Sequence, residues 1–247
     1  MRVISRLDIK NNTLIKGLSF EGLRKLGSPE DFAKKYFEEH IDEIMYIDSV
    51  ASLYSREGLY EILTFTVKNI FVPVTVGGAI RSVADALLYF KNGADKISIN
   101  TGAVENPQLI NDLVKNFGSA NVALSIEAKK INHNTWNVFT STGRDDSGKE
   151  IKDWISEAID RGVGEIAITS IDNDGYQNGF DYEMIDCAIG SASVPLIVGG
   201  GFGKLEHLDK LNKSVSGILI GSALHYEKLT LNSIKSYLKK LNFDIRV

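Results

Sequence analysis

The chain repeats a set of short strand-like segments, and this internal repeat constrains its fold more than any other feature. Segments of the first half return in the same order in the second half, at offsets of 119 to 122 residues. Because this period far exceeds that of a solenoid repeat, each copy must be a half-domain of several elements. The matching pairs are LDIK (7–10) with IEAK (126–129), EIMYIDS (43–49) with EIAITSID (165–172), VTVGGAI (74–80) with LIVGGGF (196–202), and ISINTGA (97–103) with ILIGSAL (218–224).

Composition limits the domain organisation and the partners. The 247 residues, 43% of them hydrophobic, can bury a large core. Four strands alone would leave sheet edges unpaired, so we expect one domain over residues 1–247, with halves at about 1–120 and 121–247.

A net charge of −4 offers no basic field for nucleic acid. The charged N-terminus is no secretory signal, no apolar run approaches a membrane span, and Cys187 has no disulfide partner, so we expect a cytoplasmic protein with a buried structural thiol.

Runs rich in β-branched residues alternate with amphipathic stretches, which is typical of parallel strands joined by crossover helices. The count and lengths match an α/β fold, a (β/α)8 TIM barrel built from two duplicated half-barrels. An open doubly wound sheet is the alternative. Ser28-Pro29 and Asn106-Pro107 predict helix starts, whereas KKINHNTWNVFTST (129–142) predicts an inserted β-ribbon. Strands are expected at about 3–8, 43–48, 72–76, 96–100, 121–127, 165–170, 194–198 and 217–221.

Two acidic residues stand at matching strand ends, Asp8 after the first strand and Glu127 after the fifth. In a TIM barrel these strands lie opposite each other, and their C-terminal ends belong to the active face. Opposed carboxyls suit acid–base chemistry, in which one group gives a proton and the other takes one. The structural alternative is that both only cap loops or pair with Lys10 and Lys129.

Glycines follow the third and seventh strands and predict two phosphate sites. Backbone N–H groups at glycines approach a phosphate closely, and the start of a following helix adds a favourable dipole. Two such nests on opposite sides of a barrel imply one ligand with a phosphate at each end. The residues of the two sites are Gly77, Gly78, Asn100 and Thr101 in the first half, and Gly200, Gly201, Gly221 and Ser222 in the second.

The segment SIDNDGYQNG (170–179) follows the sixth strand and offers carboxylates to the same face. Asp172 and Asp174 could hold sugar hydroxyls or assist catalysis, although Asn-Asp-Gly is also an ordinary turn. Thr169, just before it, directs a hydroxyl to the same place, and Gly175 closes the turn.

Charged residues also stand at the opposite ends of four strands: Arg2, Glu43, Lys96 and Glu165. Charges that point into a barrel must pair, because their desolvation is otherwise too costly. A neutral salt-bridge plug that closes the barrel floor is therefore one interpretation of this set. The four histidines have no metal-ligand spacing, and we predict neither a metal nor a cofactor.

These motifs, in this order, resemble the cyclase subunit of imidazole glycerol phosphate synthase, an enzyme of histidine biosynthesis. The resemblance covers nearly the whole chain. It implies that ammonia from a separate glutaminase subunit, the partner in a heterodimer, crosses the barrel to the active face. There it reacts with a bisphosphorylated ribulosyl nucleotide to give imidazole glycerol phosphate and an aminoimidazole carboxamide nucleotide. The most specific segments are KGLSFEGLRKLGSPEDFAKKY, GADKISINTGAVENPQLI, TSIDNDG and GKLEHL.

The resemblance also implies roles for single residues. Asp8 occupies the general-acid position and Glu127 the general-base position, where the family has aspartate. Lys16 falls on a substrate-contacting lysine in a mobile loop, and Asp174 on an auxiliary aspartate. Asp95 matches a residue that faces the glutaminase. The four residues that match the family's ammonia gate are Arg2, Glu43, Lys96 and Glu165.

The active face departs from the family pattern in several places. Glu127 is one methylene longer than aspartate, and Arg6, which replaces a small residue, would favour the ionised form of Asp8. The other departures are Ala79 for glycine, Tyr176 for a small hydroxyl residue and Gly199 for serine. Two alternatives to the cyclase therefore stand beside it: a paralogue that relays ammonia for amidation of a nucleotide sugar in surface-polysaccharide synthesis, and a related sugar-phosphate isomerase barrel.

Overall fold

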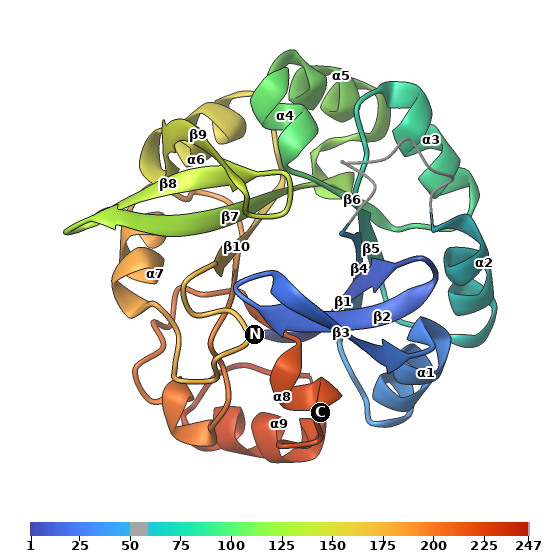
Figure 1. The fold of residues 1–247 in the computed structure, drawn as a ribbon, viewed down its shortest axis with the longest axis vertical. Coiled ribbons are helices and arrows are strands. Elements are labelled where there is room, and N and C mark those ends of the chain that lie inside the picture. The colour runs from blue at the N-terminus through green and yellow to red at the C-terminus, as the bar shows by residue number, and fades with distance from the viewer. Residues whose placement is uncertain (50–58, 247) are drawn as a thin grey trace.

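A computed structural model describes residues 1–49 and 59–246, which form a closed barrel surrounded by helices (Figure 1). Within these residues eight parallel strands follow one another in the order β10-β11-β12-β1-β4-β5-β6-β7, and β7 pairs with β10. This closure confirms the predicted TIM barrel, and the open-sheet alternative is wrong. The barrel strands are β1 (Arg2–Lys10), β4 (Glu43–Asp48), β5 (Val74–Gly77), β6 (Lys96–Ile99), β7 (Val122–Asn132), β10 (Glu165–Ser170), β11 (Leu196–Gly199) and β12 (Gly217–Ile220).

Helices cover the outside of the barrel (Figure 1). None of those in the described ranges is long and apolar enough to cross a membrane. The boundary expected between the two half-barrels, near residue 120, falls at the 3-10 helix η1 (Ser119–Asn121). The α-helices are α1 (Pro29–Glu38), α2 (Tyr60–Asn69), α3 (Val83–Lys91), α4 (Thr101–Glu105), α5 (Gln108–Phe117), α6 (Ile151–Asp160), α7 (Tyr182–Ile189), α8 (Ser222–His225) and α9 (Leu231–Lys240).

Helix starts differ in how well the sequence predicts them. Ser28 caps α1 as expected, because its hydroxyl accepts a hydrogen bond from the amide of Asp31 and proline follows it. Asn106 does not cap α5, since it already ends α4, and the cap position passes to Pro107 without a side-chain bond. Between β11 and β12 the chain forms the 3-10 helix η2 (Leu205–Leu208) instead of an amphipathic helix, because a glycine-rich loop takes up the preceding residues.

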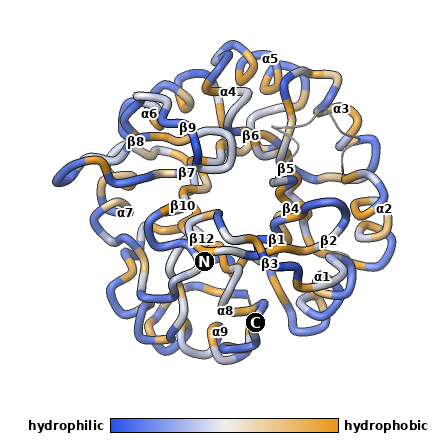
Figure 2. Tube along the Cα trace, viewed as in Figure 1, coloured by the Kyte–Doolittle hydropathy of each residue, from blue (hydrophilic) through white to orange (hydrophobic). Residues whose placement is uncertain are grey.

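Alternation along β1 sorts its side chains into layers inside the barrel. Successive side chains of a strand point to opposite faces, so Arg2, Ile4, Arg6 and Asp8 share the inner face. The layer at the level of Ile4 is apolar and separates the two ends of the barrel. Outside the strands, a larger apolar shell packs between barrel and helices. Figure 2 shows hydrophobic positions along the barrel strands and hydrophilic ones along much of the outer edge of the molecule. The inner apolar layer contains Ile4, Met45, Ala167, Ile197 and Leu219.

Two antiparallel appendages lie over the C-terminal ends of the barrel strands (Figure 1). The expected ribbon is present as the extension of β7 with β8 (Thr135–Thr140), and β9 (Asp145–Glu150) adds a third strand. The second appendage is the hairpin β2 (Thr13–Leu18) and β3 (Glu21–Gly27), where the sequence predicted a loop. It places Lys16 and its neighbours over the barrel mouth.

Candidate active site

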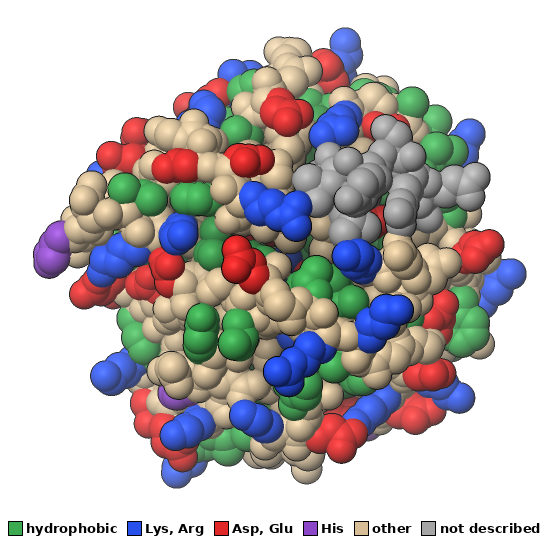
Figure 3. Space-filling view, viewed as in Figure 1, with side chains coloured by type: hydrophobic (Ala, Val, Ile, Leu, Met, Phe, Trp, Pro, Cys, Tyr) green, Lys and Arg blue, Asp and Glu red, His purple; other side chains and the backbone are tan. Residues whose placement is uncertain are grey.

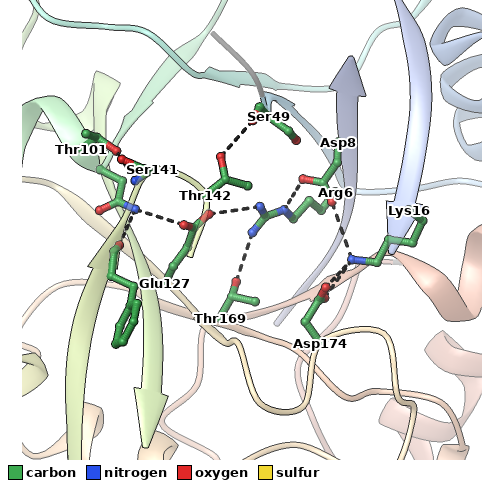
Figure 4. Close-up of polar contacts among 12 residues, drawn as sticks. Arg6, Asp8, Lys16, Ser49, Thr101, Glu127, Ser141, Thr142, Thr169 and Asp174 are labelled. Carbon is green, nitrogen blue, oxygen red and sulfur yellow. Dashed lines mark hydrogen bonds and ion pairs between the residues drawn. The ribbon is translucent and has the colours of Figure 1, made fainter. Parts of the chain in front are cut away.

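Arg6 occupies the centre of the barrel mouth, between the two opposed carboxyls (Figure 4). Its side chain is 5% exposed. The Nε atom donates a hydrogen bond of 2.8 Å to Asp8 Oδ1, and Nη2 lies 3.5 Å from Glu127 Oε1. The Nη1 atom donates a 3.4 Å bond to the hydroxyl of Thr169 on β10. The group between Asp8 and Glu127 is therefore a cation supplied by β1 itself.

Lys16 closes the β2–β3 hairpin onto this site. Its buried Nζ donates to both carboxylate oxygens of Asp174, at 2.6 and 2.9 Å, and lies 3.6 Å from Asp8 Oδ2. The amide of Ser19 donates a further bond of 2.9 Å to the carbonyl of Asp174. We name Arg6, Asp8, Lys16, Glu127 and Asp174 together the roof cluster.

The two opposed carboxyls of the roof cluster titrate differently. Burial acts to raise the pKa of Asp8, but the attraction of Arg6 and Lys16 outweighs it and holds this pKa below its usual value. Burial raises the pKa of Glu127, and the charge of Asp8 adds to the rise, while Arg6 offsets only part of it. The pKa of Arg6 is raised despite burial, because carboxylates surround it. The pair is therefore electrostatically unequal.

Each predicted glycine nest contains two consecutive residues with positive φ. In the second nest these are Gly200 and Gly201, at 89° and 93°, and a Cβ on Gly201 would lie 1.9 Å from the carbonyl oxygen of Gly179. In the first nest they are Gly78 at 108° and Ala79 at 53°. Ala79 thus adopts a left-handed conformation that glycine adopts without strain, at a cost of about 1 kcal/mol. The alanine noted in the sequence is a strained position of the first nest.

Two small cavities are lined by different members of the roof cluster. The first, of about 60 Å³, is lined by residues that include Gly78, Asn100, Thr101 and Glu127. The second, of about 20 Å³, is lined by Arg6, Lys16 and Asp174 together with the remaining predicted binding residues. Those residues are Thr169, Gly175, Gly200, Gly201, Gly221 and Ser222. Ligand pockets usually measure roughly 300 Å³ or more, and an outer groove of about 720 Å³ shares Lys16, Gly175 and Ser222 with the second cavity.

Some predicted residues lie outside these cavities. Gly77 ends β5 and packs between Ile47 and Ser98 without lining the first cavity. Asp172 accepts a 2.9 Å bond from the amide of Lys130 and fastens the ribbon, so it does not join the roof cluster. Tyr176 is 49% exposed and borders an outer groove beside the β2–β3 hairpin.

Several residues near the site had no role assigned from the sequence. Phe20 covers the Arg6 guanidinium at 5.0 Å and packs with Phe139 of β8. Thr142 donates a 2.9 Å bond to the carbonyl of Ser49, which fastens the ribbon over the first nest. Figure 3 shows that side chains, among them several lysines and arginines, cover the middle of this face. Phe20 lies in the segment KGLSFEGLRKLGSPEDFAKKY, but a sequence motif does not indicate which distant side chain an aromatic ring covers.

A buried histidine also supports the roof cluster. His225 of α8 contacts the hydroxyl of Tyr36 at 2.7 Å and the carbonyl oxygen of Arg6 at 2.9 Å. Burial and the charge of Lys16 lower its pKa to about 4, so it remains neutral at pH 7. Its ring packs against Phe32 and Tyr36. Cys187 is half-buried on α7, and burial raises the pKa of its thiol.

The four charged residues at the other end form a closed ring, which we name the floor ring. Arg2 bridges Glu43, at 2.7 Å, and Glu165. Lys96 bridges the same two carboxylates, each at 2.7 Å. Nearby, Asp95 is exposed, and its Oδ2 accepts a 2.8 Å bond from the amide of Val74. Every charge of the floor ring therefore has two partners, as pairing inside a barrel requires.

Comparison with known proteins places the chain in a family. A family model described as "Histidine biosynthesis protein" matches residues 2–230. The chain is 47% identical to the imidazole glycerol phosphate synthase subunit HisF of Legionella pneumophila, over 85% of this chain and 99% of that protein. It is 40% identical to HisF of Helicobacter hepaticus and 39% identical to HisF of Pyrococcus furiosus, each over 100% of this chain and 98% of that protein. The chain therefore belongs to the family of histidine biosynthesis proteins that includes the HisF subunit of imidazole glycerol phosphate synthase.

Proposed function

We propose that this chain is the ammonia-dependent cyclase subunit of an imidazole glycerol phosphate synthase. The reaction joins ammonia to a bisphosphorylated ribulosyl aminoimidazole carboxamide nucleotide. It yields imidazole glycerol phosphate, an aminoimidazole carboxamide nucleotide and one water. The ketone oxygen of the ribulosyl chain leaves in that water, so protons must move from the nitrogen to the oxygen.

The observation that carries this proposal is the pair Asp8 and Glu127, opposed across the barrel mouth with a glycine nest on either side. Two nests at the ends of one site suit a ligand with two phosphates. Carboxyls between them can exchange protons with the reacting atoms. Lys16 and Asp174 complete the site, as a cation for the substrate and its counter-ion.

We further propose that the ammonia reaches the site through the barrel. A glutaminase subunit would bind at the floor, where Asp95 is exposed, and release ammonia below the floor ring. Above that ring the inner apolar layer offers no charged partner that would hold an ammonium ion. Neutral ammonia crosses such a layer at a much lower desolvation cost than ammonium.

Identity to synthase subunits over nearly the whole length supports the cyclase over an ammonia relay for nucleotide-sugar amidation. The same identity supports it over an isomerase barrel. Arg6 and Glu127 are then variations within a cyclase site.

The test is turnover by the purified chain, supplied with the ribulosyl substrate and ammonium chloride at alkaline pH. We expect imidazole glycerol phosphate to form, detected by chromatography, and a glutaminase encoded with this chain to make glutamine an alternative nitrogen source. A folded protein that forms no product above background would overturn the proposal. If no glutaminase encoded with this chain binds it, the glutaminase partner would have to be dropped from the proposal.

A further inference from the structure

We infer that Arg6 determines which opposed carboxyl carries the proton, so that Glu127 is the first proton donor of the reaction and Asp8 the first acceptor. This assignment exchanges the roles that the family resemblance implies. It rests on the proposed cyclase function, and it makes Arg6 a positioning residue that acts through the two carboxyls.

Asp8 is the better-compensated carboxylate. The Nε atom of Arg6 donates to it at 2.8 Å, and Lys16 Nζ lies 3.6 Å away. Asp174 pairs with the same lysine, whose Nζ lies 2.6 Å from Asp174 Oδ2. Burial and the charge of Lys16 lower the pKa of His225, from α8, to about 4, and the small interaction of His225 with Asp8 acts in the same direction as the two cations. With two cations close to it, Asp8 is held in its ionised form.

Glu127 has much weaker compensation for a negative charge. It is 5% exposed, and its partners are Arg6 Nη2 at 3.5 Å, Asn100 Nδ2 at 3.4 Å and the backbone N–H of Gly143. Arg6 Nη2 makes no hydrogen bond within the described part of the chain. Opposite Glu127 on the neighbouring strand β8 stands Phe139, which contributes no charge. A carboxyl in this setting takes up the available proton.

Charge counting leads to the same assignment. The roof cluster contains three carboxyls, Asp8, Glu127 and Asp174, against two cations, Arg6 and Lys16. One bound proton makes the buried cluster neutral. Asp174 and Asp8 each have a close cation, so the proton belongs on Glu127.

The proton transfers of the reaction then balance. As the ammonia nitrogen bonds to the ketone carbon, Asp8 takes a proton from nitrogen and Glu127 gives one to the oxygen. When the C–O bond breaks, Asp8 returns its proton to the departing oxygen, which leaves as water. Glu127 takes the second proton from nitrogen, and both carboxyls are restored.

Carboxyl titration by NMR tests this assignment without any turnover. The chain is labelled with 13C in the aspartate and glutamate carboxyls, and the two resonances are identified by their loss in Asp8→Asn and Glu127→Gln. In the native protein we expect Glu127 to titrate at higher pH than Asp8. In Arg6→Gln we expect the Asp8 midpoint to rise by at least about one pH unit, a tenfold change in its acid dissociation constant.

Two further variants control for general effects. Arg144→Gln removes an exposed arginine from the same face and should leave both midpoints in place, because exposed charges are screened. Arg6→Lys keeps the charge and should preserve the order of the two midpoints. Titration of Asp8 above Glu127 in the native protein, or an Asp8 midpoint unmoved in Arg6→Gln, would overturn the inference. Because neither readout needs substrate, this failure is distinct from a failure of the cyclase proposal.

Discussion

The two ends of the barrel contain similar charged residues, but their numbers of positive and negative groups differ. The floor ring has two cations and two carboxylates, and each cation bridges both carboxylates. The roof cluster has two cations and three carboxyls, arranged so that one carboxyl, Glu127, has only a long ion pair. The floor ring is neutral with every group ionised, whereas the roof cluster becomes neutral only by binding a proton.

This difference in charge balance gives the two ends of the barrel different capacities for proton transfer. A balanced buried ring has no reason to bind or release protons. An unbalanced cluster has one proton that can be moved at little cost, which acid–base chemistry requires. The following variants test whether the two ends are as separate as their charge balance indicates.

The largest effect is expected from Asp8→Asn in the roof cluster. Loss of an acid–base group lowers kcat by about 10²- to 10⁴-fold, and the amide also removes the charge that Arg6 and Lys16 neutralise. Ammonium-driven product formation measures this loss. In the floor ring, Glu43→Gln should reduce the same rate by less than about tenfold, since a residue remote from the reacting atoms moves no proton. Equal losses of kcat in Asp8→Asn and Glu43→Gln would show that the two ends of the barrel do not differ in their part in the chemistry.

A smaller effect, on stability, is expected from Glu43→Gln. Glu43 is 1% exposed, and its removal as an anion leaves Arg2 and Lys96 with one carboxylate between them. We expect the free energy of unfolding to fall by about 2 kcal/mol, less than for a fully buried pair because Arg2 is partly exposed. Urea unfolding measures it, with the exposed pair variant Glu38→Gln as the control that should change little.

A further effect is expected in how the free energy of unfolding depends on pH, because only the roof cluster contains a carboxyl expected to hold a proton. The folded pKa of Glu127 is raised by burial, so its contribution to stability is present at low pH and is lost as pH rises through that folded pKa. The amide of Glu127→Gln does not titrate, so this variant keeps its stability over the same pH range. The free energy of unfolding of the native protein should therefore fall relative to that of the variant above pH ~4.3, by at most ~1.4 kcal/mol per pH unit. Parallel stability curves for the two proteins would show that Glu127 is not held protonated.

The smallest effect is expected in the first nest. Ala79→Gly relieves a φ of 53° and should raise the free energy of unfolding by roughly 0.5 kcal/mol, the strain relieved minus the added flexibility of glycine. Ala120→Gly, in the 3-10 helix η1, is the matched control and should lower it. The same sign in both variants would remove the argument for strain at Ala79.

Sequence alone predicted the barrel because alternation and the internal repeat act over many residues. The inner face of β1 follows directly from the spacing of Arg2, Arg6 and Asp8. The β2–β3 hairpin was missed although Asn11 and Asn12, which form the turn from β1 into β2 at φ of 50° and 56°, are residues that favour such a turn. The turn of the hairpin itself, at Ser19 and Phe20, has positive φ without glycine or asparagine and offers no such signal.

The ion pairs of the roof cluster were only partly predictable from the sequence. The spacing of Arg6 and Asp8 indicated their contact, which the structure confirms at 2.8 Å. The reach of Arg6 across the barrel to Glu127 depends on side-chain conformation and on the packing of Phe20 above it. Those contacts between distant segments leave no local pattern in the sequence.

The most direct test of the account is the pH profile of ammonium-driven kcat/KM, measured at constant free ammonia for the native protein and Arg6→Gln. If Arg6 keeps Asp8 ionised as the proton acceptor, the acid limb of the profile belongs to Asp8. We predict that this limb moves to higher pH by at least about one unit in Arg6→Gln. An acid limb that stays at the native position would contradict the account.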